Sequence, residues 1–282
     1  MCSKKRIVSA LILLGLAGCV GVVLYHRNEL AEWYHFTRTF ESLGANEQGR
    51  REFRHRESGI VFARIPAGSF LMGSPEDEPG SRDWERPVHE VRLSAFLIAK
   101  HELGQRDWTK VMGENLFTFV GADLPAENVS WHDSQEFCRR LGFSLPTEAQ
   151  WERACRGDTK SPFSFGNEAN RQQVQFWDGA TFRTPTVPVG SLPPNPFGLH
   201  EVHGNVSEWC EDIYDEDFYK RPEAQERDPV CTEGTGHRVV RGGDASLPSY
   251  QCRAASRSWA EPSNRSFTIG LRPVWNYLSP KR

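Results

Sequence analysis

A single cysteine near the end of the chain decides which chemistry the surrounding segment can do. Residues 238–258 read RVVRGGDASLPSYQCRAASRS, and Cys252 is the only thiol in this stretch. A thiol reacts or binds metal as the thiolate, so a reactive Cys252 needs a lowered pKa, which Arg253 or Arg257 could provide. The segment is therefore either a lone redox thiol site or a structural cysteine site.

Short helices and long loops must position these residues. Ser130 and Thr147 are each followed three residues later by Asp or Gln, which is the spacing of a capping box. The helices expected after them span 131–141 and 148–156, and each ends before a glycine. The 24 glycines, 18 prolines and 9 tryptophans indicate ordered loops and short strands. We predict an α+β fold with much irregular structure.

Residues 1–27 have the pattern of a membrane anchor. The basic residues 4–6 precede an uncharged run over 7–25, which as a helix would be about 28 Å long, close to the ~30 Å of a bilayer core. The basic flank favours a cytoplasmic N-terminus, so the bulk of the chain is expected in the periplasm or outside the cell. Residues 16–19 resemble a lipobox, so the anchor is either a spanning helix or a lipid on Cys19. A buried core helix is a third alternative, which three glycines in the run disfavour.

The rest of the chain divides into a polar segment and one domain. Residues 28–56 are charged, with scattered aromatic side chains, and are interpreted as a juxtamembrane spacer. Short apolar alternation begins after Glu57 and reaches a Pro-Ala-Gly turn at 66–68, so a domain is predicted over 57–278. The net charge of −3 gives no reason to expect a nucleic-acid partner.

Six sequence blocks of this domain follow one another in a recognisable order. They are RIPAGSFLMGS (64–74), PVHEVRLSAFLIAKHEL (87–103), LPAENVSWHDSQEFCRRLGFSLPTEAQWERACRG (124–157), PNPFGLHEVHGNVSEWCED (194–212), RVVRGG (238–243), and RAASR with GLRP (253–257 and 270–273). Over residues 57–275 the chain resembles the formylglycine-generating enzyme, or sulfatase-modifying factor, superfamily. The resemblance implies a loop-rich variant of the C-type-lectin-like fold, with short strands and a few short helices.

The same resemblance implies a catalytic site that this chain has altered. Active members carry two cysteines just after the glycine pair, which bind copper and oxidise a substrate cysteine with oxygen. Here Asp244 stands where the family has serine, and Ser207 replaces the usual aromatic residue of GNVSEW. No cysteine lies between Gly243 and Cys252. We therefore expect no copper. Because activity depends on the site and not on the fold, we place Asp244, Ser207, Cys252 and His237 around a candidate pocket between GNVSEW and GGDASLPSY.

The resemblance also implies structural roles for cysteines and arginines. Some family members pair a cysteine of the ACRGG block with one near the AAR block, which corresponds to Cys155 and Cys252 and suits an oxidising compartment. The alternative for Cys252 is the lone redox thiol. Arg253, Arg257 and Arg272 match positions that bond backbone carbonyls and carboxylates, and the alternative is a pocket for an acidic ligand.

A structural calcium ion is implied at the GNVSEW block. Relatives bind it through a side-chain oxygen, two backbone carbonyls and a glutamate, which correspond to Glu201, the carbonyls of Gly204 and Val206, and Glu208. Hard oxygen donors suit Ca²⁺. The alternative is that Glu208 only accepts hydrogen bonds from backbone amides. The nine histidines are dispersed, and their spacing by itself predicts no transition-metal site.

Three functions are compatible with these features. The favoured one is a membrane-tethered, exported module that lacks catalysis and binds or regulates an envelope protein or peptide, because degenerate relatives serve as accessory factors. A second is a periplasmic oxidoreductase of altered chemistry that matures a secondary metabolite or a protein. A third is a lectin-like surface domain whose loops bind ligand. The sequence leaves open whether the chain is an enzyme, and formylglycine generation itself is not expected.

Overall fold

The computed structural model describes residues 34–114, 117–177, 179 and 185–277. It divides into a part that ends at Glu41, in which residues 34–39 are helical, and a folded unit over Ser42–Arg282. The predicted anchor, with Cys19, lies outside the described residues. Within them, no helix combines the length and the apolar character needed to cross a bilayer.

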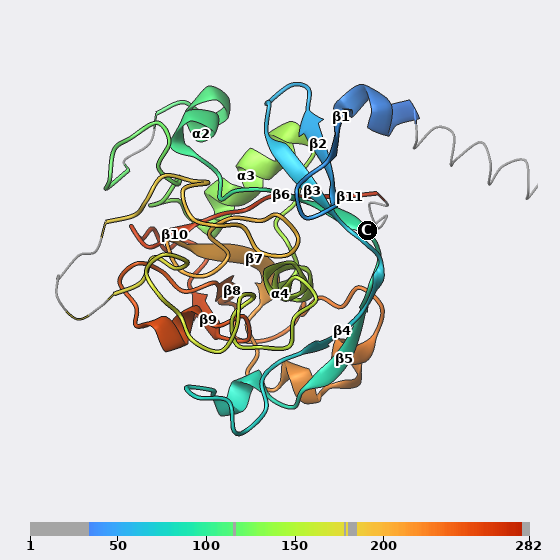
Figure 1. Ribbon diagram of the computed structural model, residues 1–282, viewed down its shortest axis with the longest axis vertical. Helices are drawn as coiled ribbons and strands as arrows, with labels where there is room; N and C mark the ends of the chain where they lie inside the picture. The colour runs from blue at the N-terminus through green and yellow to red at the C-terminus, as the bar shows by residue number, and fades with distance from the viewer. Residues whose placement is uncertain (1–33, 115–116, 178, 180–184, 278–282) are drawn as a thin grey trace, which may run out of the picture. The chain divides into compact units, whose positions relative to one another are not determined.

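Among the described residues, five strands form the first sheet in the order β1-β2-β3-β6-β11 (Figure 1). Adjacent pairs from β2 to β11 are antiparallel, and Phe53 of β2 is buried opposite Phe62 of β3. The interpretation of 28–56 as a spacer is therefore wrong for β2, which belongs to the folded domain. The bounds are Phe40–Ala45 (β1), Arg51–His55 (β2), Val61–Ile65 (β3), Phe96–Ala99 (β6) and Val274–Asn276 (β11).

The second sheet has the order β10-β7-β8-β9, and β4 pairs separately with β5. Strand β7 runs antiparallel to β8, with Glu208 opposite Arg241, and parallel to β10. The GNVSEW and RVVRGG blocks are therefore neighbours in one sheet. The bounds are Gly68–Met72 (β4), His89–Leu93 (β5), Ser207–Ile213 (β7), Arg238–Arg241 (β8), Arg257–Ala260 (β9) and Ile269–Gly270 (β10).

The helices begin and end where the sequence provides caps. Ser130 and Thr147 each accept a hydrogen bond from the backbone amide three residues later, and that residue's side chain bonds back, so both predicted capping boxes are confirmed. A glycine with left-handed backbone follows each of these helices. The helices are α2 (Gln105–Met112), α3 (Trp131–Leu141) and α4 (Glu148–Arg156), with 3-10 turns at Asp83–Glu85, Phe218–Lys220, Pro222–Gln225 and Ser249–Cys252. The predicted α+β class, with short strands and few helices, is confirmed.

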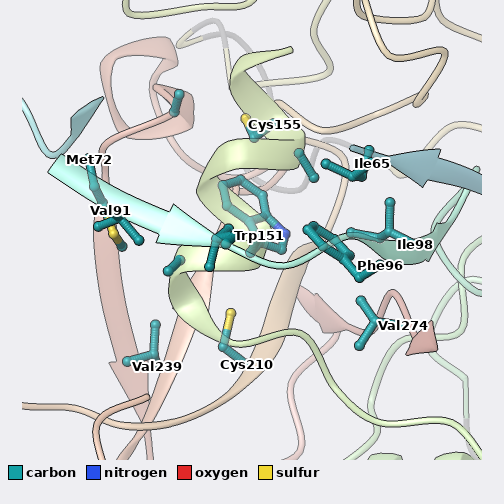
Figure 2. Close-up of a cluster of buried hydrophobic side chains, with 14 of the residues drawn as sticks. Ile65, Met72, Val91, Phe96, Ile98, Trp151, Cys155, Cys210, Val239 and Val274 are labelled. Atoms are coloured by element: carbon teal, nitrogen blue, oxygen red, sulfur yellow. The ribbon is translucent and has the colours of Figure 1, made fainter. Parts of the chain in front are cut away.

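Helix α4 joins the three sheets through the hydrophobic core. It packs against β4 and β5 as well as β7 and β8 (Figure 1). Figure 2 shows the indole of Trp151 projecting from α4 toward Phe96 and Ile98 of β6. Each large apolar side chain buried in this way stabilises the fold by about 1.5–3 kcal/mol. The core also takes side chains from every sheet, including Ile65, Met72, Val91, Cys210, Val239 and Val274.

Buried ion pairs tie the loops to this core. Arg253 donates to Glu85 at 2.9 and 3.0 Å, and Arg257 donates to Glu148 at 2.7 and 3.0 Å. Each guanidinium also donates to backbone carbonyls, as does Arg272. These contacts confirm the scaffold role predicted for the three arginines. Removing one partner of such a buried pair leaves an uncompensated charge and lowers the free energy of unfolding by about 3–5 kcal/mol.

Candidate functional site

A sharp turn after β8 assembles most of the predicted pocket residues. Gly242 and Gly243 have φ angles of 98° and 66°, a region that favours glycine. A Cβ on Gly243 would lie 2.8 Å from the sulfur of Cys252, so a side chain has no room there. The turn places Asp244 next to Cys252 and within hydrogen-bond distance of Ser207, the first residue of β7. Three residues from three separate segments therefore meet, as the sequence predicted.

Asp244 is held by neutral donors. Its Oδ2 accepts from Ser207 Oγ at 3.3 Å, and its Oδ1 accepts from the amide and hydroxyl of Ser246 at 2.9 and 2.5 Å. Burial raises the pKa of Asp244, and these hydrogen bonds partly oppose the rise. A carboxyl group thus occupies the position next to Cys252, and oxygen is a poor ligand for Cu(I).

The environment of Cys252 keeps its thiol protonated. The side chain is fully buried, burial raises the pKa of Cys252, and the Asp244 carboxyl raises it further. The two arginines that could lower this pKa contact other groups, since Arg253 pairs with Glu85 and Arg257 pairs with Glu148. The arrangement therefore gives no activation of the thiol by either arginine.

His203 is a buried member of this site that the sequence analysis did not assign to it. Its Nδ1 donates to the carbonyl of Cys252 at 2.8 Å, and its Nε2 accepts from the amide of Ser164 at 3.0 Å, which fixes the tautomer. Burial lowers the pKa of His203 to about 4, so the ring is neutral near pH 7. Both nitrogens are engaged, and His203 holds the Cys252 backbone in place. His203 directly precedes the GNVSEW block, and this adjacency was the available signal.

Both cysteines of the predicted disulfide border this imidazole. Cys155 Sγ lies 3.7 Å from each ring nitrogen of His203, and Cys155 raises the pKa of Cys252 electrostatically. The two sulfur atoms therefore share one buried neighbourhood. In the structure both are free thiols, and their disulfide remains a prediction for the oxidised protein.

His237 does not join the pocket residues, which corrects the predicted set. Its ring stacks on Trp259 with centroids 4.3 Å apart, and its Nδ1 lies 3.1 Å from Thr235 Oγ1. His237 precedes β8, whereas Gly242 follows it, and a strand of four residues spans about 13 Å. His237 was assigned to the pocket because the sequence did not show that residues 238–241 form an extended strand.

The two carboxylates expected to bind calcium are held by protein donors. Glu201 accepts from the backbone amides of Gly190 and Leu192, each at 2.8 Å. Glu208 accepts from a tryptophan N–H at 2.6 Å and from Arg272 at 2.8 to 3.1 Å. The guanidinium neutralises Glu208 and would repel a cation at the same oxygens. The side chain of Glu208 fits an ion pair rather than a calcium ligand, so calcium binding stays a prediction of the resemblance alone.

Glu102 is a third carboxylate in this region, and the sequence analysis missed it. It accepts from the amide of Val206 at 3.0 Å and from a neighbouring side-chain amide. Burial raises the pKa of Glu102 well above its usual range, and the charges of Glu201 and Glu208 raise it further. All three carboxylates act on Arg272. The raised pKa favours the neutral, protonated form of Glu102.

Two histidines distant in sequence meet beside Glu201. The ring centroids of His101 and His200 are 4.7 Å apart. In the described part of the chain, His101, His200 and Glu201 form the one group of three His, Cys, Asp or Glu side chains whose ligand atoms all lie within 4.8 Å of one another. The spacing of the histidines gave no such indication, because His101 and His200 come from different sequence blocks.

Two surface hollows lie away from the turn after β8. Their volumes are about 290 and 310 Å³. Neither hollow is lined by Ser207, Asp244 or Cys252, which are all buried. The first is lined by Glu90, Arg92, Gln225 and Arg227, and the second by Glu57, Ser58, Asp107, Lys110, Val111, Arg140 and Leu141.

Sequence comparison finds one matching domain family and several similar proteins. Residues 50–277 match the family described as the sulfatase-modifying factor enzyme 1-like domain. The formylglycine-generating enzyme of Thermomonospora curvata is 28% identical over 291 residues, covering 79% of this chain and 95% of that enzyme. The serine/threonine-protein kinase pkn1 of Chlamydia caviae is 32% identical over 253 residues, covering 80% of this chain and 40% of the kinase. The chain thus spans less than half of that relative.

Structural comparison gives the same relationship. The solved structure of PvdO from Pseudomonas aeruginosa superimposes with a TM-score of 0.70 and 26% identity, covering 79% of this chain and 97% of PvdO. The family match begins at residue 50, in agreement with the inclusion of β2 in the folded domain. The ordered sequence blocks, the α+β fold and both comparisons agree, and the chain belongs to the formylglycine-generating-enzyme-like family of sulfatase-modifying factor domains.

Proposed function

We propose that this chain is a non-catalytic binding or regulatory member of its family, exported and tethered to the membrane by residues 1–27. Its partner on this proposal is a protein or peptide of the cell envelope, with no role for nucleic acid. The state of Cys252 carries the proposal: the thiol is buried and protonated, and the adjacent imidazole of His203 has both nitrogens hydrogen bonded. A two-sulfur Cu(I) site needs a second thiol, and residues 244–251, between the glycine pair and Cys252, contain none.

The catalytic half of the proposal is tested with the full chain purified in mild detergent. The protein is loaded with copper and incubated under oxygen with a sulfatase-type Cys-x-Pro-x-Arg peptide, and mass spectrometry measures conversion of the cysteine. The Thermomonospora curvata formylglycine-generating enzyme, assayed in parallel, is the positive control. We expect no conversion by this chain. Conversion that disappears in Cys252→Ser would overturn the proposal.

An exposed aromatic side chain on an edge strand supports the binding half. Strand β9 is at one edge of the second sheet, and Trp259 on this strand is 50% exposed. The ring of His237 lies against the indole, with centroids 4.3 Å apart and ring planes tilted by 33°. Edge strands and exposed aromatic side chains are recurrent elements of protein recognition, because both offer contacts with little loss of conformational freedom. We place the partner-binding surface at Trp259 and His237.

A photoreactive amino acid tests this surface in cells. Placed at Trp259 of the full chain, it should give a discrete cross-linked species in the membrane fraction, whereas the same residue at the exposed His132 of α3 should not. Trp259→Ala should reduce the amount of partner that copurifies, with an unchanged midpoint of unfolding. Equal cross-linking from both positions, or none from position 259, contradicts a binding surface there.

A second candidate function is a periplasmic oxidoreductase of altered chemistry. The meeting of Ser207, Asp244 and Cys252 favours it, because polar groups from separate segments converge there. Such an enzyme needs a reactive thiol, so native Cys252 would be alkylated rapidly near neutral pH. Rapid alkylation of the folded protein that is absent in Cys252→Ser would put this function ahead of the binding module.

A further inference from the structure

The group formed by His101, His200 and Glu201 has the composition of a metal site. Their potential ligand atoms all lie within 4.8 Å of one another. Bonds of ~2.1 Å in a tetrahedral zinc site set ligand atoms about 3.4 Å apart, so small side-chain movements would suffice. Two imidazoles and one carboxylate suit zinc and its neighbours among the divalent transition metals, whereas calcium prefers oxygen donors throughout.

The backbone holds the three residues in place before any ion arrives. The amide of His200 donates to the carbonyl of Lys100 at 3.0 Å, which ties the two histidine segments together. Arg272 donates to the carbonyls of Lys100 and His200 at 3.1 and 2.8 Å. Gly190 covers His101 so closely that a Cβ there would lie 2.8 Å from His101 Cε1. A site built from such fixed segments loses little entropy when it binds an ion.

The hydrogen bonds leave ring nitrogens for a metal. His200 Nδ1 lies 2.8 Å from the carbonyl of Leu192, an acceptor, so Nδ1 carries the proton and Nε2 has the free lone pair. Among the described residues, none forms a hydrogen bond with the buried Nδ1 of His101. A buried polar atom without a partner costs free energy unless something binds it. Glu201 is oriented by two backbone amides, as ligating carboxylates commonly are.

Charge and protonation agree with this geometry. Burial lowers the pKa of His101 to about 3 and also lowers that of His200, so both rings are neutral and can donate lone pairs at pH 7. A divalent cation next to Glu201 would neutralise the charge of this carboxylate. Both histidines are only partly buried, so solvent reaches part of each side chain.

We propose that His101, His200 and Glu201 bind a divalent transition-metal ion, for which zinc is the probe, and that the ion fastens the loop at 190–201 to the segment after β6. The site has three protein ligands, and water completes it. It shares Glu201 with the set of residues that the family resemblance assigned to calcium, but the two imidazoles set its preference for nitrogen-binding metals.

Zinc retention by the full chain tests the proposal. The chain is purified in mild detergent with a histidine-free tag, stripped with chelator, incubated with zinc and desalted. We expect about one zinc per chain, unaffected by excess calcium, and a raised unfolding midpoint because the ion binds the native state. His101→Gln and His200→Gln should each bind zinc at least about 10-fold more weakly, since even changes behind the ligands cost that much. His132→Gln, at an exposed histidine of α3, is the matched control.

X-ray absorption of the unaltered chain tests the proposed ligands without relying on variants, which could fail to fold. X-ray absorption of the zinc-loaded protein should show two imidazoles with light oxygen ligands and no sulfur. The unfolding midpoints of the metal-free histidine variants check that these proteins are folded. The proposal is overturned if the unaltered chain retains no zinc, if the folded His101→Gln and His200→Gln variants retain as much as His132→Gln, or if the absorption spectrum reports sulfur ligands.

Discussion

The carboxylate of Glu208 lies against the guanidinium of Arg272, with N–O distances of 2.8 to 3.1 Å, and each side chain is 1% exposed. Arg272 also donates to backbone carbonyls on both sides of the site. We predict that Glu208→Gln lowers the free energy of unfolding by about 3–5 kcal/mol, because the guanidinium stays buried without its counter-charge. Urea denaturation measures the loss.

The control for this prediction is a pair at the surface. Arg265 and Asp133 lie 2.7 Å apart with 49% and 25% exposed side chains. Arg265→Gln should cost no more than about 1 kcal/mol, since solvent screens such pairs. Similar losses for Glu208→Gln and Arg265→Gln would mean that the buried pair contributes nothing beyond a surface contact.

Calcium distinguishes the ion pair from the role implied by the family. If Glu208 serves Arg272 alone, then removing calcium with EGTA or adding it back leaves the melting temperature of the full chain unchanged. Differential scanning calorimetry measures this directly. A rise with calcium that is lost in Glu208→Gln would restore the oxygen site of Glu201, Gly204, Val206 and Glu208.

The disulfide prediction concerns the exported, non-reduced protein. After trypsin digestion, Cys155 lies on the peptide 154–156 and Cys252 on the peptide 242–253. We expect mass spectrometry to find the two peptides cross-linked, and reduction to lower the unfolding free energy by about 2–5 kcal/mol. Recovery of both peptides as free thiols from exported protein would remove the disulfide and leave two buried cysteines that act as small apolar side chains.

Stability should depend on pH through His203. Its pKa is about 4 in the folded protein and 6.5 ordinarily, so between these values the unfolded chain binds more protons than the native chain. The free energy of unfolding therefore rises as pH increases from about 4 to about 6.5, by about 3 kcal/mol from this group, and is flat above. Urea unfolding of wild type and His203→Gln across this range should show the smaller slope in the variant. Equal slopes would show that His203 is not buried as a neutral ring.

Membrane topology is a prediction of the sequence alone. A reporter that is active only in the periplasm, fused after Arg282, should be active because residues 4–6 favour a cytoplasmic N-terminus. Palmitate incorporation that is lost in Cys19→Ala would replace the spanning helix with a lipid anchor. A silent reporter on a stable fusion would contradict export by either route.

Local patterns predicted the helices better than the start of the domain. The capping boxes at Ser130 and Thr147 contain their own hydrogen-bond partners, so the sequence alone specifies where α3 and α4 begin. Strand β2 reads REFRH, in which Arg51 is exposed at the start of the strand and Arg54 on the face opposite Phe53, so the one buried apolar side chain stands among charged neighbours. Charged outer faces of this kind look like a linker when the pairing strand is unknown.

Site residues from neighbouring sequence blocks were easier to predict than contacts between segments far apart in the chain. Ser207 lies in one sequence block and Asp244 directly follows the next, and the structure brings the two side chains within hydrogen-bond distance of each other. The meeting of His101 with His200 was not predictable from spacing, since it depends on how β6 and the loop before β7 pass each other. Glu102 was missed because a charged residue in a short apolar block is ordinarily exposed. Such contacts arise from tertiary packing, which single-sequence patterns do not contain.

The pairing of β11 with β6 sets how this protein can fold. Val274 of β11 lies opposite Ile98 of β6, which is far earlier in the chain. Val274 also forms an isolated β-bridge with Ser144, a residue between the two in sequence. Contacts at such sequence separation form slowly, because a long loop must close before they stabilise anything. The first sheet therefore cannot be completed before β11 has been synthesised. Until β11 pairs with β6, that edge of β6 is open, and an unpaired strand edge can associate with other strands.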